Sequence, residues 1–390
     1  MLSSRLRHAP IAGFLVALAV LWPVLVCGQA ITNGNNIGLP PNGVFSGSAF
    51  DNVQLNNGNL HIEIPLVVLP GRGLSTAYKY VYDNKGGWQD QIHCGHASEI
   101  CTSFIKKAPG NTMHWPLVQS LGGSMSFEFG KYSCVTGAPA FTVTTNYLFI
   151  ESNGTKHNFL PGQLVTPGSA NIYCPAYGTT LYASDGSGWL MYTDPANGVP
   201  TKMVGPDGTV VEGIVRDSNG NQFAVNGTDT LGRQLPTLVF NSTTGKHEFT
   251  YSDSSGAPRI IQIARTSVPV QTSVCGYADG DICYEYSGSN SVISEIEFPN
   301  GMKYTFTHVQ NSHGEPANVV LPTGGQIAWT WAPAADDIGG RRVATRIVTA
   351  NGQTAQWSYV RDPVAATITM TDPANNATKA YCTFSASGSC

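Results

Sequence analysis

The sequence predicts an all-β protein, built as an array of antiparallel β-sheets and hairpins. After the first thirty residues, no window of eleven or more has apolar residues at helical spacing. Apolar and polar residues instead alternate in many short runs, as in Gln326–Trp331, and this alternation is typical of strands with one buried face. The 43 glycines and 24 prolines indicate frequent turns between such strands.

The first element is a signal peptide over residues 1–30. Arg5 and Arg7 precede an apolar run over residues 11–26, and small residues follow at 28–30, where a signal peptidase would cut. We therefore expect a secreted or cell-surface protein. No second apolar run reaches spanning length, so we expect no membrane span after cleavage of the signal.

The charge content excludes a polyanionic partner. Charged residues make up 12% of the chain and the formal net charge is −4, whereas a nucleic-acid surface needs a basic stripe. The sequence therefore predicts no nucleic-acid partner. It also shows no cofactor motif, no Gly-x-Ser-x-Gly elbow and no His-Glu-x-x-His metal motif, so we predict a protein that is not an enzyme and carries no cofactor.

The cysteines indicate disulfides. Nine are present and eight follow the signal, an even number that favours disulfides in an exported chain. The segment His93–Cys101 could hold zinc, but pairing of its two cysteines would remove the thiolates, so we predict no metal. Spacing favours three local pairs and leaves two further cysteines, although the sequence alone does not fix connectivity: Cys94 with Cys101, Cys275 with Cys283, Cys382 with Cys390, then Cys134 and Cys174.

The next element is a β-sandwich-like module over residues 31–200. Its opening stretch, "LNNGNLHIEIPLVVLPGRG" at 55–73, contains a turn, an alternating strand, a proline and a second glycine-rich turn. Its boundary is expected near "DPANGVP" and "GPDG", where the chain is punctuated at 194–208.

Residues 201–390 form the last predicted element, a degenerate β-hairpin array. Asp217, Asp229, Asn241 and Asp253 fall twelve residues apart, and three of them open Asp-x-x-Gly. Asp can hydrogen-bond its own backbone two residues on, and Gly supplies the positive φ that closes a hairpin turn, which leaves about eight residues for each strand. The glycines expected to form such turns are Gly58, Gly71, Gly220, Gly232 and Gly256.

These motifs resemble the RHS/YD-repeat family. The repeat form Tyr-Asp-x-x-Gly is approached by "YDNKG" at 82, "DTLGR" at 229 and "YSDSSG" at 251, and the family's upstream block by "NNGNL" at 56, "IPL" at 64 and "PGRGL" at 70. The resemblance implies repeats that wind a sheet into a hollow shell. Because the repeats are degenerate and the chain stops at Cys390, it implies an opening segment, a truncated product or a minimal exported relative.

Three functions follow from these features. We expect first a non-catalytic structural or interaction protein, with glycans or other surface proteins as partners. The sequence does not determine its oligomeric state. The second is a carbohydrate-binding module that stacks sugars on exposed aromatic rings, from Trp329, Trp331, Trp357 and Tyr359, although alternating Trp on a strand more often belongs to the core. The third, a glycan hydrolase, needs two carboxylates across a cleft, drawn from Glu63, Glu128, Glu151, Glu295 and Glu297.

Overall fold

The structure is a computed structural model of the chain. It describes residues 38–39, 43–70, 75–85, 89–94, 101–107, 115–119, 123–132, 141–159, 164–165, 174–175, 180–194, 198–223, 228–272, 282–332, 341–362, 364–365 and 367–381. Within these ranges every regular element is a strand, and neighbouring strands pair antiparallel except β22 with β6. The all-β, antiparallel prediction is confirmed. The predicted signal peptide lies outside the described residues.

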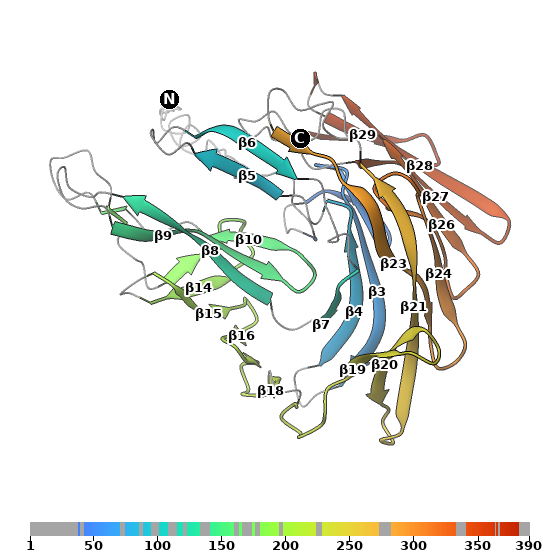
Figure 1. Cartoon of the computed structure of the whole chain (residues 1–390), viewed down its shortest axis with the longest axis horizontal. Coiled ribbons are helices and arrows are strands. Elements are labelled where there is room, and N and C mark those ends of the chain that lie inside the picture. The colour runs from blue at the N-terminus through green and yellow to red at the C-terminus, as the bar shows by residue number, and fades with distance from the viewer. Residues whose placement is uncertain are drawn as a thin grey trace, which may run out of the picture. The chain divides into compact units, whose positions relative to one another are not determined.

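The largest sheet has eleven strands, which lie side by side almost in chain order (Figure 1). Only β22 leaves this order, because it pairs with β6 in another sheet. The strands are β19 (Thr237–Asn241), β20 (Lys246–Ser252), β21 (Pro258–Gln271), β23 (Ser287–Glu297), β24 (Lys303–His308), β25 (Pro316–Val320), β26 (Gln326–Ala332), β27 (Arg342–Ala350), β28 (Gln353–Asp362), β29 (Thr367–Thr371) and β30 (Ala377–Tyr381).

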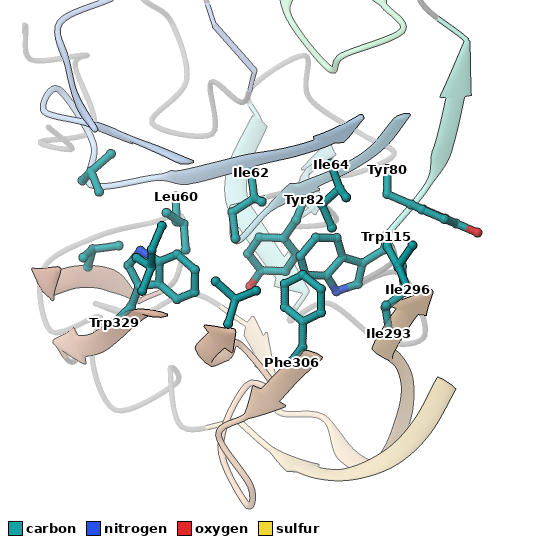
Figure 2. Close-up of a cluster of buried hydrophobic side chains, with 14 of the residues drawn as sticks. Leu60, Ile62, Ile64, Tyr80, Tyr82, Trp115, Ile293, Ile296, Phe306 and Trp329 are labelled. Atoms are coloured by element: carbon teal, nitrogen blue, oxygen red, sulfur yellow. The ribbon is translucent and has the colours of Figure 1, made fainter. Parts of the chain in front are cut away.

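A five-stranded sheet from the N-terminal part covers one face of this large sheet. Its order is β1 (Phe45–Gly47), β2 (Asp51–Gln54), β3 (Leu60–Leu69), β4 (Thr76–Asp83) and β7 (Leu117–Gln119). Along β3 the apolar residues Leu60, Ile62 and Ile64 alternate with polar ones and are fully buried. Figure 2 shows them pointing toward Trp329 and Phe306 of the large sheet, with which they form one hydrophobic core.

Four smaller sheets use the remaining strands. The sheets are β10 (Lys156–Phe159), β9 (Phe141–Glu151) and β8 (Gly123–Tyr132); β13 (Thr180–Tyr182), β14 (Leu190–Thr193), β15 (Pro200–Val204), β16 (Val210–Val211), β17 (Val215–Arg216) and β18 (Gln222–Phe223); β11 (Leu164–Val165) and β12 (Cys174–Pro175); and β22 (Ile282–Tyr284), β6 (Cys101–Lys107) and β5 (Gln89–Cys94). A second hydrophobic core, with Phe149, Met191 and Met203 at its centre, lies between the sheet that contains β9 and the sheet that contains β14 and β15.

One turn geometry recurs along the chain. The fourth residue donates its N–H to the carbonyl of the first, the first donates its N–H to the carbonyl of the fifth, and the fourth has a positive φ. This is a type I turn closed by a residue in the left-handed region, a common three-residue hairpin. It begins at Glu151, Gly205, Asp217, Asp229, Asp253, Phe298, Leu321 and Asp372.

The aspartates of the predicted repeat organise this turn. The Asp229 carboxylate accepts the backbone N–H of Leu231 and of Arg233, at 2.9 Å each, and Asp217 and Asp253 repeat the pattern. Asn241 opens a turn that is one residue longer, because Gly245 donates to its carbonyl. Gly58, Gly220, Gly232 and Gly256 all have positive φ, and Gly71 lies outside the described residues.

The twelve-residue spacing does not produce uniform strands. Strands β16, β17 and β18 have two residues each, whereas β21 has 14. Residue 200 falls within the six-stranded sheet, and the large core takes residues from both sides of it. The division into modules at 31–200 and 201–390 stays a prediction.

Candidate functional site

A buried ion pair connects the two sheets of the large core. Asp51, on β2, is fully buried, and Arg346, on β27, is 4% exposed. Arg346 binds both carboxylate oxygens, Nε to Oδ2 and Nη2 to Oδ1, each at 2.6 Å. The Ser48 hydroxyl donates a further hydrogen bond to Oδ1 at 2.7 Å. A buried pair survives desolvation only with such complete hydrogen bonding, so these groups form a closed structural contact.

Three of the four predicted ligand-binding aromatics surround this pair. Trp329 donates from Nε1 to Asp51 Oδ2 at 3.2 Å, the Trp357 ring lies 4.9 Å from the Arg346 guanidinium carbon, and the Tyr359 hydroxyl contacts Ser46 Oγ at 3.2 Å. Trp331 donates instead to the carbonyl of Pro316 at 2.9 Å.

The prediction that these aromatics form an exposed sugar platform is wrong. Trp329, Trp331 and Tyr359 are buried, and Trp357 is half-buried against the same core. Trp329, Trp331 and Tyr359 belong to the core that the N-terminal strands complete, because alternating residues of β26 and β28 are buried there. No sugar ring can reach the three buried residues without unfolding this part of the sheet.

A second polar cluster surrounds His61 on β3. Its Nδ1 lies 3.1 Å from both oxygens of Asp83, its cross-strand partner on β4, and its Nε2 lies 3.2 Å from Glu63 Oε1. Lys79 completes the cluster, with Nζ 2.6 Å from the same Glu63 oxygen. The imidazole is fully buried. Along the contacts, acidic and basic side chains alternate in the order Asp83, His61, Glu63, Lys79.

A third cluster repeats this arrangement around His157 on β10. Its Nδ1 lies 2.6 Å from Asp185 Oδ2, and its Nε2 lies 2.7 Å from Glu151 Oε1. The Trp189 indole donates to the same Glu151 oxygen at 3.0 Å. Each histidine is therefore held between two carboxylates, one at each ring nitrogen.

The carboxylates raise the pKa of both histidines. Burial alone would lower the pKa of each imidazole, but Asp83 and Glu63 raise that of His61 to about 9, and Asp185 and Glu151 raise that of His157 to about 9. Burial would raise the pKa of Glu63, but hydrogen bonds from His61 and Lys79 lower it to about 2. A histidine that stays protonated at neutral pH is a poor general base, so these clusters are suited to bracing.

A local motif places both histidines, and the sequence prediction missed it. Each histidine is the last residue of an Asn-Gly-x-x-His motif, "NGNLH" at 57 and "NGTKH" at 153. In both, the Asn side chain accepts the backbone N–H two residues on at 2.9 Å, and the Gly has a positive φ. The two turns differ by one residue in length, but in both the Asn-Gly corner is followed by a histidine on the next strand, three residues after the Gly.

A fourth cluster lies where the turn after β24 meets the start of β27. Arg341 Nη1 lies 3.5 Å from Glu315, and it also contacts Ser312. Burial raises the pKa of Glu315, although Arg341 opposes the change. Burial and Arg341 together lower the pKa of His313 to about 4. Glu315 is thus a buried carboxyl with a raised pKa, a property that general acids share with structural groups.

The carboxylates predicted for a hydrolase are engaged elsewhere. Glu63 and Glu151 hold the histidines, and Glu295 binds Lys303 at 2.8 Å and Lys246 at 3.1 Å. Lys303 first, then Lys246, lower the pKa of Glu295, the opposite of what a general acid requires. Glu297 lies 3.3 Å from Lys246. The Glu128 side chain lies outside the described part.

The backbone register places one predicted cysteine pair. Cys94 on β5 and Cys101 on β6 are cross-strand partners. Residues directly opposite in antiparallel strands have Cα atoms about 4.5–5.5 Å apart, within the range of disulfides. Cys174 lies on β12 and Cys283 on β22. The other predicted disulfide residues lie outside the described ranges: Cys134, Cys275, Cys382 and Cys390.

The described residues yield two further findings. They contain no helix that is long and apolar enough to cross a membrane. They also show no gathering of three or more His, Cys, Asp or Glu side chains suited to a metal ion.

No protein-family model matches the chain, and no curated protein matches it in sequence.

Proposed function

We propose that the chain is an exported, non-catalytic structural or interaction protein, built as the opening of a YD-like β-hairpin array. The observation that carries this proposal is the way its polar residues are used. Buried charges pair between the two sheets in Asp51 with Arg346 and across neighbouring strands in His61 with Asp83, and so brace the sheets.

The resemblance to RHS/YD-repeat proteins supplies the architecture in this proposal. One hairpin turn recurs from Glu151 to Asp372, and in several turns Asp occupies the position that the YD repeat gives it. In "YDNKG" the Tyr82 ring packs on Trp115 and Asp83 binds His61, so this copy contributes to the core. An array of this kind supports an interaction function because its strands present extended surfaces.

A turnover screen tests the non-catalytic part. We expect the mature chain to release no reducing ends from a panel of soluble polysaccharides. Turnover that Glu315→Gln abolishes, while the thermal midpoint stays unchanged, would overturn the proposal in favour of a hydrolase. Glu295→Gln provides the control, because Glu295 lies on β23, next to β24, but its pKa is lowered.

A protease-shaving experiment on intact host cells tests export. We expect peptides from the chain in the released fraction or in the culture medium. Recovery of the full-length chain, signal included, from the cytosol alone would contradict the proposal. The intact mass of the native protein then distinguishes a self-contained chain from the opening of a longer shell.

A further inference from the structure

The edge strand β19 exposes consecutive apolar side chains. Leu238, Val239 and Phe240 are 39%, 60% and 56% exposed. Among the described strands, β19 pairs only with β20, so its outer backbone edge carries N–H and C=O groups without a ladder partner.

Two cross-strand rows of the core end at this edge. Leu238 lies opposite Phe249, which lies opposite Ile261, and both of the latter are fully buried. Phe240 lies opposite His247, and His247 lies opposite the buried Ile263. Leu238 and Phe240 thus continue the apolar face of the sheet, but they are its exposed last members.

The edge lacks the charges that usually protect one. No charged residue occurs from Gln234 to Gly245, although edge strands commonly carry Lys or Glu against unwanted pairing. The opposite edge of the same sheet, β30, carries the exposed Lys379 at its centre. The two edges therefore differ in charge, one of the features that oppose pairing with another strand.

The strand is complementary to itself. Antiparallel pairing of two copies about a two-fold axis through Val239 places Val239 against Val239, Leu238 against Phe240 and Thr237 against Asn241. Apolar side chains then meet apolar ones in the middle, polar ones meet at the ends, and no charges oppose one another. The row that ends in Leu238 continues into the partner's Phe240 row on the same face.

We infer that β19 is a self-association edge, through which two copies of the chain join their large sheets into one continuous sheet. This goes beyond the proposed function, because edge pairing does not depend on export or on the absence of catalysis. β19 has five residues, so the paired segment is short and buries little surface. We therefore expect a weak dimer whose fraction depends on protein concentration.

Sedimentation velocity of the mature chain tests this, from about 5 to about 500 µM, because small interfaces bind weakly. We expect the wild-type protein to shift from monomer toward dimer, and Val239→Lys to weaken dimerisation more than about tenfold, since it sets two ammonium groups face to face. Val360→Lys is the matched control: Val360 is 63% exposed but lies on β28, inside the sheet. It should leave dimerisation unchanged.

A charge-swap experiment separates edge pairing from a folding defect. Val239→Glu alone should weaken dimerisation in the same way, whereas an equimolar mixture of V239K and V239E should regain dimers, because opposite charges then meet. A wild-type protein that stays monomeric over the whole range would overturn the inference. So would a V239K dimer as strong as wild type, or equal loss in V360K.

Discussion

Asp51→Asn is expected to cost about 3–5 kcal/mol of unfolding free energy, the usual penalty for removing one partner of a buried ion pair. The substitution leaves the Arg346 guanidinium, 4% exposed, without its counter-charge. The side-chain oxygen of Asn can still accept from Trp329, so the loss arises mainly from charge. Because the two residues are 295 positions apart, the pair couples the N-terminal strands to the large sheet.

This free energy corresponds to a measurable shift of the thermal midpoint. An unfolding entropy of about 2 cal/mol/K per residue gives roughly 0.7 kcal/mol/K for some 350 cooperatively unfolding residues. The expected drop is then about 4–7 °C in calorimetry, with a matching loss in urea unfolding. Arg259→Gln is the matched control, since Arg259 is 52% exposed and pairs with Asp253 at the surface. It should cost less than about 1 kcal/mol.

A double variant completes the test. Asp51→Leu with Arg346→Met replaces the ion pair with apolar side chains, and such replacements are often neutral or stabilising. The single variants of this cycle are Asp51→Leu and Arg346→Met. We expect the double variant to regain most of the stability that either of them loses, which the double-mutant cycle measures as strong coupling. If Asp51→Asn costs no more than Arg259→Gln, or if the two single losses simply add, the ion-pair reasoning is refuted.

Three other results are expected. Gly232→Val should cost about 1–3 kcal/mol, because a β-branched residue is strained at a φ of +72° although space is open around its Cβ; an unchanged thermal midpoint would remove the turn assignment. The pH dependence should carry both signs: the raised pKa values of His61 and His157 give a contribution that is complete below 6.5 and lost as pH rises through about 9. The lowered pKa of His313 gives one that is present above 6.5 and lost as pH falls toward about 4. The lowered pKa values of Glu63 and Asp185 give one that is complete above about 4.5 and lost toward pH 2. Thermal melts across this range, with a flatter alkaline limb in His61→Gln, check both signs. Finally, an unreduced peptide map should contain Cys94 linked to Cys101, and a link from either to another cysteine would contradict the register.

The sequence was sufficient for the all-β class and for several of the hairpin turns. Period-two alternation located β26, and Asp-x-x-Gly located hairpins that the structure forms at Asp217, Asp229 and Asp253. Both signals are local, because a strand's pleat and a turn's hydrogen bonds involve residues close in the chain. The local motif Asn-Gly-x-x-His could have been found in the same way.

Alternation indicated that the aromatics more often belong to the core, but it did not show what covers them. The pattern around Trp329 shows which residues share a face, but it does not show whether another sheet covers that face. The cover comes from β3, more than two hundred residues earlier in the chain, and its register there depends on the whole fold. The pairing of Asp51 with Arg346 could not be predicted for the same reason.

The N-terminal strands explain why the hairpin array can have an apolar inner face. Stacked hairpins bury side chains against their neighbours only along the sheet, so one face of a single sheet would stay exposed to water. Leu60, Ile62 and Ile64 cover that face, and Asp51 fixes their sheet to β27 through Arg346. It follows that the array from β20 to β28 depends on the residues before it. The described part of the opening stretch, residues 55–70, therefore acts here as the cover of the sheet's apolar face.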